Sequence, residues 1–207
     1  MRSTVSRDGL TVMESYSPKF HDRTVENARW ADFTVAFAVD FTSPGERLTA
    51  TAAGEEYLPF DLPHSGEELE DEGLRRRMAT ILARRLESRT DPVRLNVAGS
   101  TAADLSRHGI SQEQADAFVT DVLGRAVDEG LRIQDLRTGG QSGIDEAGTK
   151  AALALGIPAS QVVPGDSSTS MSPGSPIGTG TPSSAVSTAS ALTREGRISM
   201  SERRWRG

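Results

Sequence analysis

The feature of this chain that most constrains its fold is a repeated order of apolar strand, glycine-containing loop and amphipathic helix. Residues 33–39 form a nearly continuous apolar run, which is typical of a strand buried on both faces. Apolar side chains alternate at 93–97, and an apolar stripe at helical spacing covers 115–126 and stops before Gly130. This order predicts βαβ units, and so an α/β fold with a Rossmann-like open parallel sheet flanked by helices.

Composition divides residues 10–207 of this chain of 207 residues into three parts. Residues 10–164 carry the periodic pattern and form the predicted ligand-binding domain. Residues 165–193 are rich in Ser, Thr, Gly and Pro and cannot bury enough apolar surface to offset their chain entropy, which predicts a disordered linker or insertion. Residues 194–207 are basic, and we expect either an unstructured tail or a segment that docks back onto the domain.

Composition also excludes several classes of protein. The chain has no Cys, which rules out thiolate metal sites and Cys nucleophiles, and its three His are widely spaced, so we expect no metal site. The net charge of −6 argues against binding to a nucleic-acid duplex. Neither a signal peptide nor an apolar run of membrane-spanning length is visible, so we expect a cytoplasmic protein without a membrane partner.

Two loops lie where the carboxyl ends of parallel strands would form a ligand crevice. Loop one is 98–101 and loop two is 138–143. Paired glycines let a ligand approach the backbone, Ser142 can cap the following helix, and free N–H groups at that helix terminus can bind phosphate. The predicted ligand-binding residues are Gly99, Ser100 and Thr101 in loop one, and Gly139, Gly140, Gln141, Ser142 and Gly143 in loop two.

Two acids directly behind loop two are the candidate catalytic residues. Asp145 and Glu146 lie in the first turn of the helix predicted at 144–155. Either carboxylate could hold ribose hydroxyls or act as an acid or base, or the pair could simply stabilise the helix N-terminus. Four further polar residues near element ends either line the same crevice or are turn and surface residues: Asp40, Glu46, Arg47 and Asp61.

Loop two and its helix resemble the second signature of the SLOG superfamily of Rossmann-like, nucleotide-binding domains. The segment 139–158, GGQSGIDEAGTKAALALGIP, is similar to the pattern G-G-Q-T-G-x-D-x-A of the molybdenum-carrier-like branch, with Ser142 in place of Thr. NVAGS at 96–100 is similar to the first glycine loop of that superfamily. The resemblance covers 93–164, about a third of the chain. After the last predicted strand the chain departs from the family pattern, with Val163-Pro164-Gly165-Asp166 and then the Ser/Pro/Gly tract. If Arg197 to Arg206 supplies the displaced end of the family domain, 165–192 is an insertion.

This resemblance implies three functions. The first is a sensor or sequestering protein for a nucleotide-derived or phosphate-containing small ligand. The second follows the phosphoribohydrolases of the same superfamily, in which a Glu at the distance of Glu146 from Gly139 cleaves an N-glycosidic bond; residues 137–138 and 142–143 depart from that motif. The third is a carrier of molybdenum cofactor. A non-binding interaction domain is a further alternative, and an apolar stripe at 74–86 suits either the core or a homo-oligomer interface.

Overall fold

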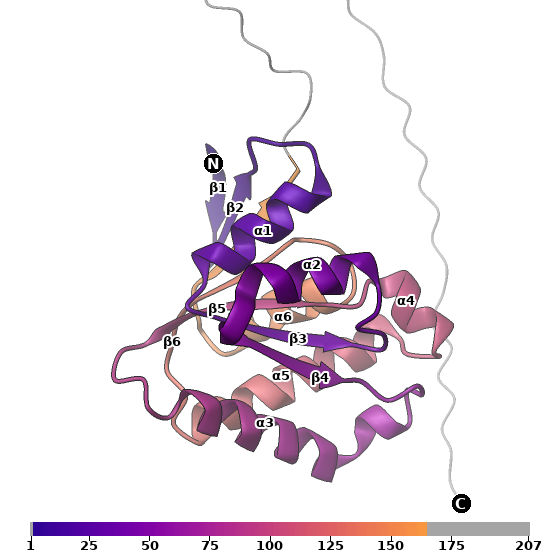
Figure 1. Ribbon diagram of the computed structural model, residues 1–207. Helices are drawn as coiled ribbons and strands as arrows, with labels where there is room; N and C mark the ends of the chain where they lie inside the picture. The colour runs from indigo at the N-terminus through magenta and orange to yellow at the C-terminus, as the bar shows by residue number, and fades with distance from the viewer. Residues whose placement is uncertain (1, 165–207) are drawn as a thin grey trace, which may run out of the picture. The chain divides into compact units, whose positions relative to one another are not determined.

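The computed structural model describes residues 2–164 (Figure 1). The predictions for 165–193 and 194–207 lie outside the described residues. The domain therefore begins earlier than the predicted residue 10, because β1 (Arg2–Arg7) and β2 (Leu10–Glu14) form a hairpin at the start of the chain.

Within residues 2–164, seven strands form one sheet in the order β1-β2-β7-β6-β5-β3-β4. Six of them run parallel, and β1 is antiparallel to β2 at one edge. The predicted α/β, Rossmann-like parallel sheet flanked by helices is confirmed. The remaining strands are β3 (Phe33–Ala38), β4 (Tyr57–Asp61), β5 (Val93–Gly99), β6 (Ile133–Thr138) and β7 (Ala159–Val163).

Helices cover both faces of the sheet. On one face, α1 (Phe20–Trp30) packs beside α2 (Pro44–Ala53), and Figure 1 shows these two helices opposite α3 and α5. On the other face lie α3 (Glu72–Leu86), α5 (Gln112–Asp128) and α6 (Ile144–Ala154). The short α4 (Ala102–Arg107) follows β5 directly. Every helix in this part of the chain is too short or too polar for a membrane span.

The two faces of the sheet differ in chemistry. Side chains alternate along each strand, so Phe33, Val35 and Phe37 of β3 face α3 and α5 and belong to one continuous apolar core. Thr34 and Asn96, which are partners in the β3–β5 register, face α1 and α2 instead. The face covered by α1 and α2 also carries Arg137 and Ser160, and both are buried.

The order of the strands determines where the chain reverses its direction of progress across the sheet. From β3, the chain adds β4 on one side and then β5, β6 and β7 on the other, which is the flavodoxin-like order. The point of reversal therefore lies between β3 and β5. Ligands of such sheets bind outside the carboxyl ends of the strands at this point.

Helix starts follow from their capping residues. Ser111 and Gln114 have the sequence spacing of a capping box and form one at the start of α5. Ser65 and Glu68 also have the S-x-x-E spacing of a capping box, which predicts a helix start there, but that prediction is wrong. Helix α3 begins at Glu72 behind Asp71, whose side chain accepts a hydrogen bond from the Gly73 N–H. Ser65 accepts only from the Glu68 N–H, ahead of a single 3₁₀ turn.

Candidate functional site

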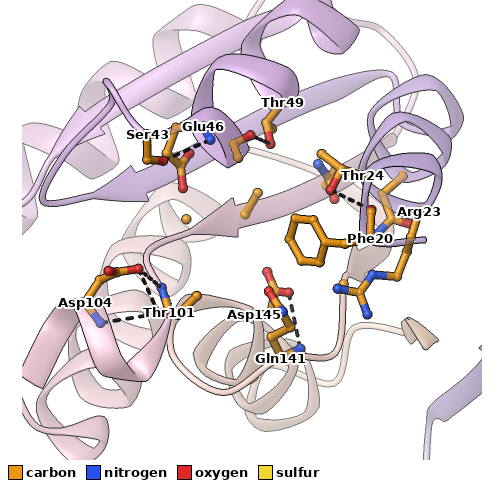
Figure 2. Close-up of a pocket in the computed structure, with 16 residues that line it drawn as sticks. Phe20, Arg23, Thr24, Ser43, Glu46, Thr49, Thr101, Asp104, Gln141 and Asp145 are labelled. Atoms are coloured by element: carbon orange, nitrogen blue, oxygen red, sulfur yellow. Dashed lines mark hydrogen bonds between the residues drawn. The ribbon is translucent and has the colours of Figure 1, made fainter. Parts of the chain in front are cut away.

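A polar cavity of about 260 Å³ opens at the carboxyl end of the sheet, on the face covered by α1 and α2 (Figure 2). Residues of α1 and α2 line two sides of it, the end of β5 forms its floor, and the two predicted loops close the remaining side. The cavity thus lies at the point where the strand order reverses. It is lined by Phe20, Arg23, Thr24, Asn27, Ser43, Gly45, Glu46, Thr49, Asn96, Ala98, Gly99, Thr101, Asp104, Gly139, Gln141 and Asp145.

Glu46 is a buried carboxylate in this cavity. Its backbone N–H donates to the Ser43 hydroxyl at 3.3 Å, which starts α2 and places the Glu46 side chain in the cavity wall. The residue is 8 % exposed, and its Oε2 has no hydrogen-bond partner. Burial, followed by the nearby carboxylates of Asp145, Asp104 and Asp40, raises the pKa of Glu46 to about 7.

Asp145 is a second carboxylate, which enters the cavity from the first turn of α6. Its Oδ2 accepts a hydrogen bond from the Gln141 N–H at 3.3 Å, and Figure 2 shows it close to Arg23. Burial raises the pKa of Asp145 to about 6, although the Gln141 and Gly139 amides and the Arg23 charge favour its ionised form. Two carboxyl groups with raised pKa values therefore share one cavity, which is common at functional sites.

Helix α1 supplies the other wall. Asn27 is 4 % exposed and its Oδ1 has no hydrogen-bond partner, although it is buried at the cavity. Arg23 is equally buried and its guanidinium lies 4.8 Å from the centre of the Phe20 ring. The Phe20 ring is 45 % exposed and points into the cavity, where it offers a flat apolar surface (Figure 2).

The two loops are joined to each other. The Ile144 N–H donates to the Ser100 carbonyl at 3.0 Å, and the Ala102 N–H donates to the Ser142 carbonyl at 3.2 Å. Gly143 adopts a φ of 100°, and a Cβ there would lie 2.4 Å from the Ser100 oxygen. Only glycine allows this close approach without a shift of the backbone.

Five of the ten predicted site residues line the cavity: Gly99, Thr101, Gly139, Gln141 and Asp145. The Ser100 hydroxyl is buried below, where it accepts the Val39 N–H at 3.0 Å. Gly140 lies against Val163 and Gln161 outside the lining. The prediction that Ser142 caps α6 was wrong: Ser142 is exposed, and the capping position is Gly143, without a side-chain cap.

Three amides of loop two already have acceptors within the chain. The N–H groups of Gly140 and Gln141 donate to Thr138 Oγ1 and Asp145 Oδ2. The Gly143 N–H donates to Gln112 Oε1 at 2.8 Å, and Gln112 Nε2 donates back to the Gly143 carbonyl at 3.0 Å. A phosphate would have to displace these contacts, so the loop offers little to the phosphate of a molybdenum cofactor.

Glu146 lies outside the cavity. Its carboxylate forms an ion pair with Lys150 at 2.7 Å on the side of α6 that faces α5, and Lys150 also contacts Asp116. Adjacent residues of a helix point about 100° apart, and Glu146 accordingly points away from the cavity that Asp145 lines. Of the two candidate catalytic acids, the structure places only Asp145 at the cavity.

A smaller group of residues continues the cavity on the far side of Glu46. A second hollow of about 320 Å³ shares Ser43, Glu46 and Asp104 with the first and adds Arg107 and His108. The His108 ring packs edge-on against His64, with ring centres 4.5 Å apart. Glu46 therefore stands between the two hollows.

The sequence pattern did not indicate that residues of α1 belong to the site. For Glu46 it left two alternatives open, a residue of the crevice or a residue of a turn or the surface. Arg47 and Asp61, named beside it, are not among the lining residues of either hollow. Spacing offered one signal for α1, since Arg23 and Asn27 are four residues apart and so share a helical face. Among the described residues, no group of three or more Asp, Glu and His side chains could hold a metal ion.

Comparisons of the chain with protein-family models, with curated proteins and with solved structures find no match. The fold and the site therefore rest on the geometry given above: a Rossmann-like sheet with an acidic, partly enclosed cavity at its point of reversal.

Proposed function

We propose that this protein binds a small nucleotide-derived ligand in the cavity between α1, α2 and loop two, as a sensor or sequestering protein. One observation carries the proposal: Asn27 Oδ1 and Glu46 Oε2 are buried without partners, and both residues line this cavity. A buried acceptor without a donor costs about 1–3 kcal/mol. A ligand that donates to both oxygens would recover that cost.

The walls of the cavity suit a nucleoside. Small-molecule sites are concave and largely preformed, with a few polar groups that fix orientation. Phe20 supplies an apolar face on which a base can stack, and the carboxylates opposite supply acceptors for ribose hydroxyls. The resemblance of loop two to SLOG domains supports the same class of ligand.

Isothermal titration calorimetry with nucleosides, nucleotides, cyclic nucleotides and ADP-ribose tests this proposal. We expect saturable heat with at least one of them. Phe20→Ala should weaken it at least about tenfold, because stacking on an aromatic ring contributes about 1–3 kcal/mol. The exposed Tyr16→Ala serves as a matched control. The absence of heat for every compound would overturn the proposal.

Hydrolysis of an N-glycosidic bond is the second candidate, and the paired carboxyl groups favour it. With a pKa of about 7, Glu46 retains a proton for a leaving nitrogen near neutral pH, while Asp145, with a pKa of about 6, is largely ionised and can accept a proton from water. Water would add to the anomeric carbon as the C–N bond breaks. Release of free base from a nucleoside by the wild type, lost in both Glu46→Gln and Asp145→Asn, would establish this activity; no release by the wild type would exclude it for the nucleosides assayed.

A further inference from the structure

We infer that the part of the ligand that enters the cavity is an uncharged, hydroxyl-bearing sugar, and that any phosphate group stays outside. This inference rests on the proposed function and deepens it. It differs from the expectation that loop two binds phosphate through its backbone.

The first step is the charge of the cavity. Three carboxyl groups line it, from Glu46, Asp104 and Asp145, and Asp104 is itself paired with Arg107. Above the pKa of Glu46, two further carboxylates therefore stand against one guanidinium, that of Arg23. Arg23 faces Asp145 and the Phe20 ring. An anionic group in this space would meet more negative than positive charge, at distances where a partly buried site screens poorly.

The second step is that the chain itself occupies part of the usual anion site. The helix that follows a glycine loop normally offers free N–H groups to phosphate. Here the Ile144 N–H is bonded to loop one, and the Gln141 N–H is bonded to the carboxylate of Asp145. The chain thus places its own anion where a phosphate would otherwise bind.

The third step is the nature of the unsatisfied groups. The two unpartnered atoms are both oxygens, Asn27 Oδ1 and Glu46 Oε2. At pH 8, above the pKa of about 7 of Glu46, its carboxyl is ionised and both atoms are acceptors. The hydroxyls of a ribose can donate to them, whereas a phosphate ester supplies only further acceptors. Sites built to bind a hydroxyl group discriminate strongly against analogues that lack it, because the buried polar groups are then left unpaired.

A matched ligand series tests the inference. Each of the four common ribonucleosides is titrated together with its 5′-monophosphate and its 2′,3′-dideoxy analogue, on the full chain. The expected result is that a ribonucleoside binds at least as tightly as its monophosphate, and that the dideoxy analogue binds at least about tenfold more weakly.

A variant series locates the effect. Glu46→Gln keeps the volume of the side chain but replaces one acceptor by a donor. It should weaken the ribonucleoside at least about tenfold and leave the dideoxy analogue nearly unchanged, which assigns the hydroxyl contact to this side chain. Glu55→Gln, the same change at an exposed position outside the cavity, should leave both affinities as they are.

The outcomes separate this inference from the proposed function. A monophosphate that binds tenfold more tightly than its nucleoside overturns the inference and leaves the proposed function intact. The inference is also overturned, and the proposed function stays intact, if ribo- and dideoxynucleosides bind with equal affinity. An unchanged ribonucleoside affinity in Glu46→Gln has the same consequence. If no nucleoside, nucleotide, cyclic nucleotide or ADP-ribose binds, the proposed function fails and the inference fails with it.

Discussion

The two faces of the sheet bury different kinds of side chains. Beneath α3, α5 and α6, the strands bury large apolar side chains, and Phe37 contacts both Phe60 and Phe118 with ring centres 5.5 and 6.0 Å away. Beneath α1 and α2, the same strands bury small or polar side chains such as Thr34 and Asn96. All unpartnered buried side-chain atoms within the described residues lie on this second face, on Asn27, Glu46 and Tyr57.

This difference indicates a division between stability and function. A close-packed apolar layer contributes most of the free energy of folding, since each fully buried large side chain contributes about 1.5–3 kcal/mol. A layer of buried polar groups with missing partners costs free energy and is retained where it binds something. The faces should therefore respond to substitution in opposite directions.

The largest effect is expected on the apolar face. Phe37→Ala should lower the free energy of unfolding by about 3–5 kcal/mol, because it leaves a cavity between β3, β4 and α5. Urea-induced unfolding measures the change. Thr34→Ala, on the same strand but the opposite face, should cost no more than about 1 kcal/mol; similar costs for the two variants would contradict the division.

The next effect has the opposite sign. Because the pKa of Glu46 is raised from 4.5 to about 7, the folded state retains a proton that the unfolded state loses, and stability falls as pH rises from 4.5 to 7. Glu46→Gln should therefore raise the free energy of unfolding at pH 8 by up to about 3 kcal/mol, and the gain should vanish near pH 4. A gain that persists at pH 4, or no gain at pH 8, would show that burial of the charge is not its cause.

The smallest effect is expected beside the cavity. Glu146→Gln removes an exposed ion pair with Lys150 and should change stability by no more than about 0.5 kcal/mol, with no change in ligand affinity. Asp145→Asn, one residue earlier, should weaken binding measured by calorimetry. If Glu146→Gln is instead the variant that loses binding or turnover, the motif resemblance is a better guide to this site than the cavity.

The fold could be predicted from the sequence where burial is apolar. The run that became β3 is apolar almost throughout, and the stripe that became α5 repeats at helical spacing, because the residues they bury are mainly Phe, Val, Leu and Ala. Helix α1 gave no such signal, since the residues it buries are Arg23, Asn27 and Ala28. The element that forms one wall of the cavity was therefore the hardest to predict.

The candidate site was predicted in part for a related reason. Glycine loops are local, so loop one and loop two were found, and Asp145 was found with them. The contribution of Glu46 depends on the strand order, which places the end of β3 beside that of β5. The spacing of residues along the chain does not reveal the strand order. It also does not reveal that Gln112 and Ser100 accept hydrogen bonds from the backbone N–H groups at the start of α6.

The register at the edge of the sheet has a consequence for engineering. Arg2 pairs with Glu14, and Glu14 pairs with Val163, so the two ends of the described domain lie two strand spacings apart, roughly 10 Å. A linker of a few residues could join them. The domain is accordingly suited to circular permutation. The new termini can be placed in the exposed segment between α3 and β5, at the amino end of the strands, whereas the cavity lies at their carboxyl end.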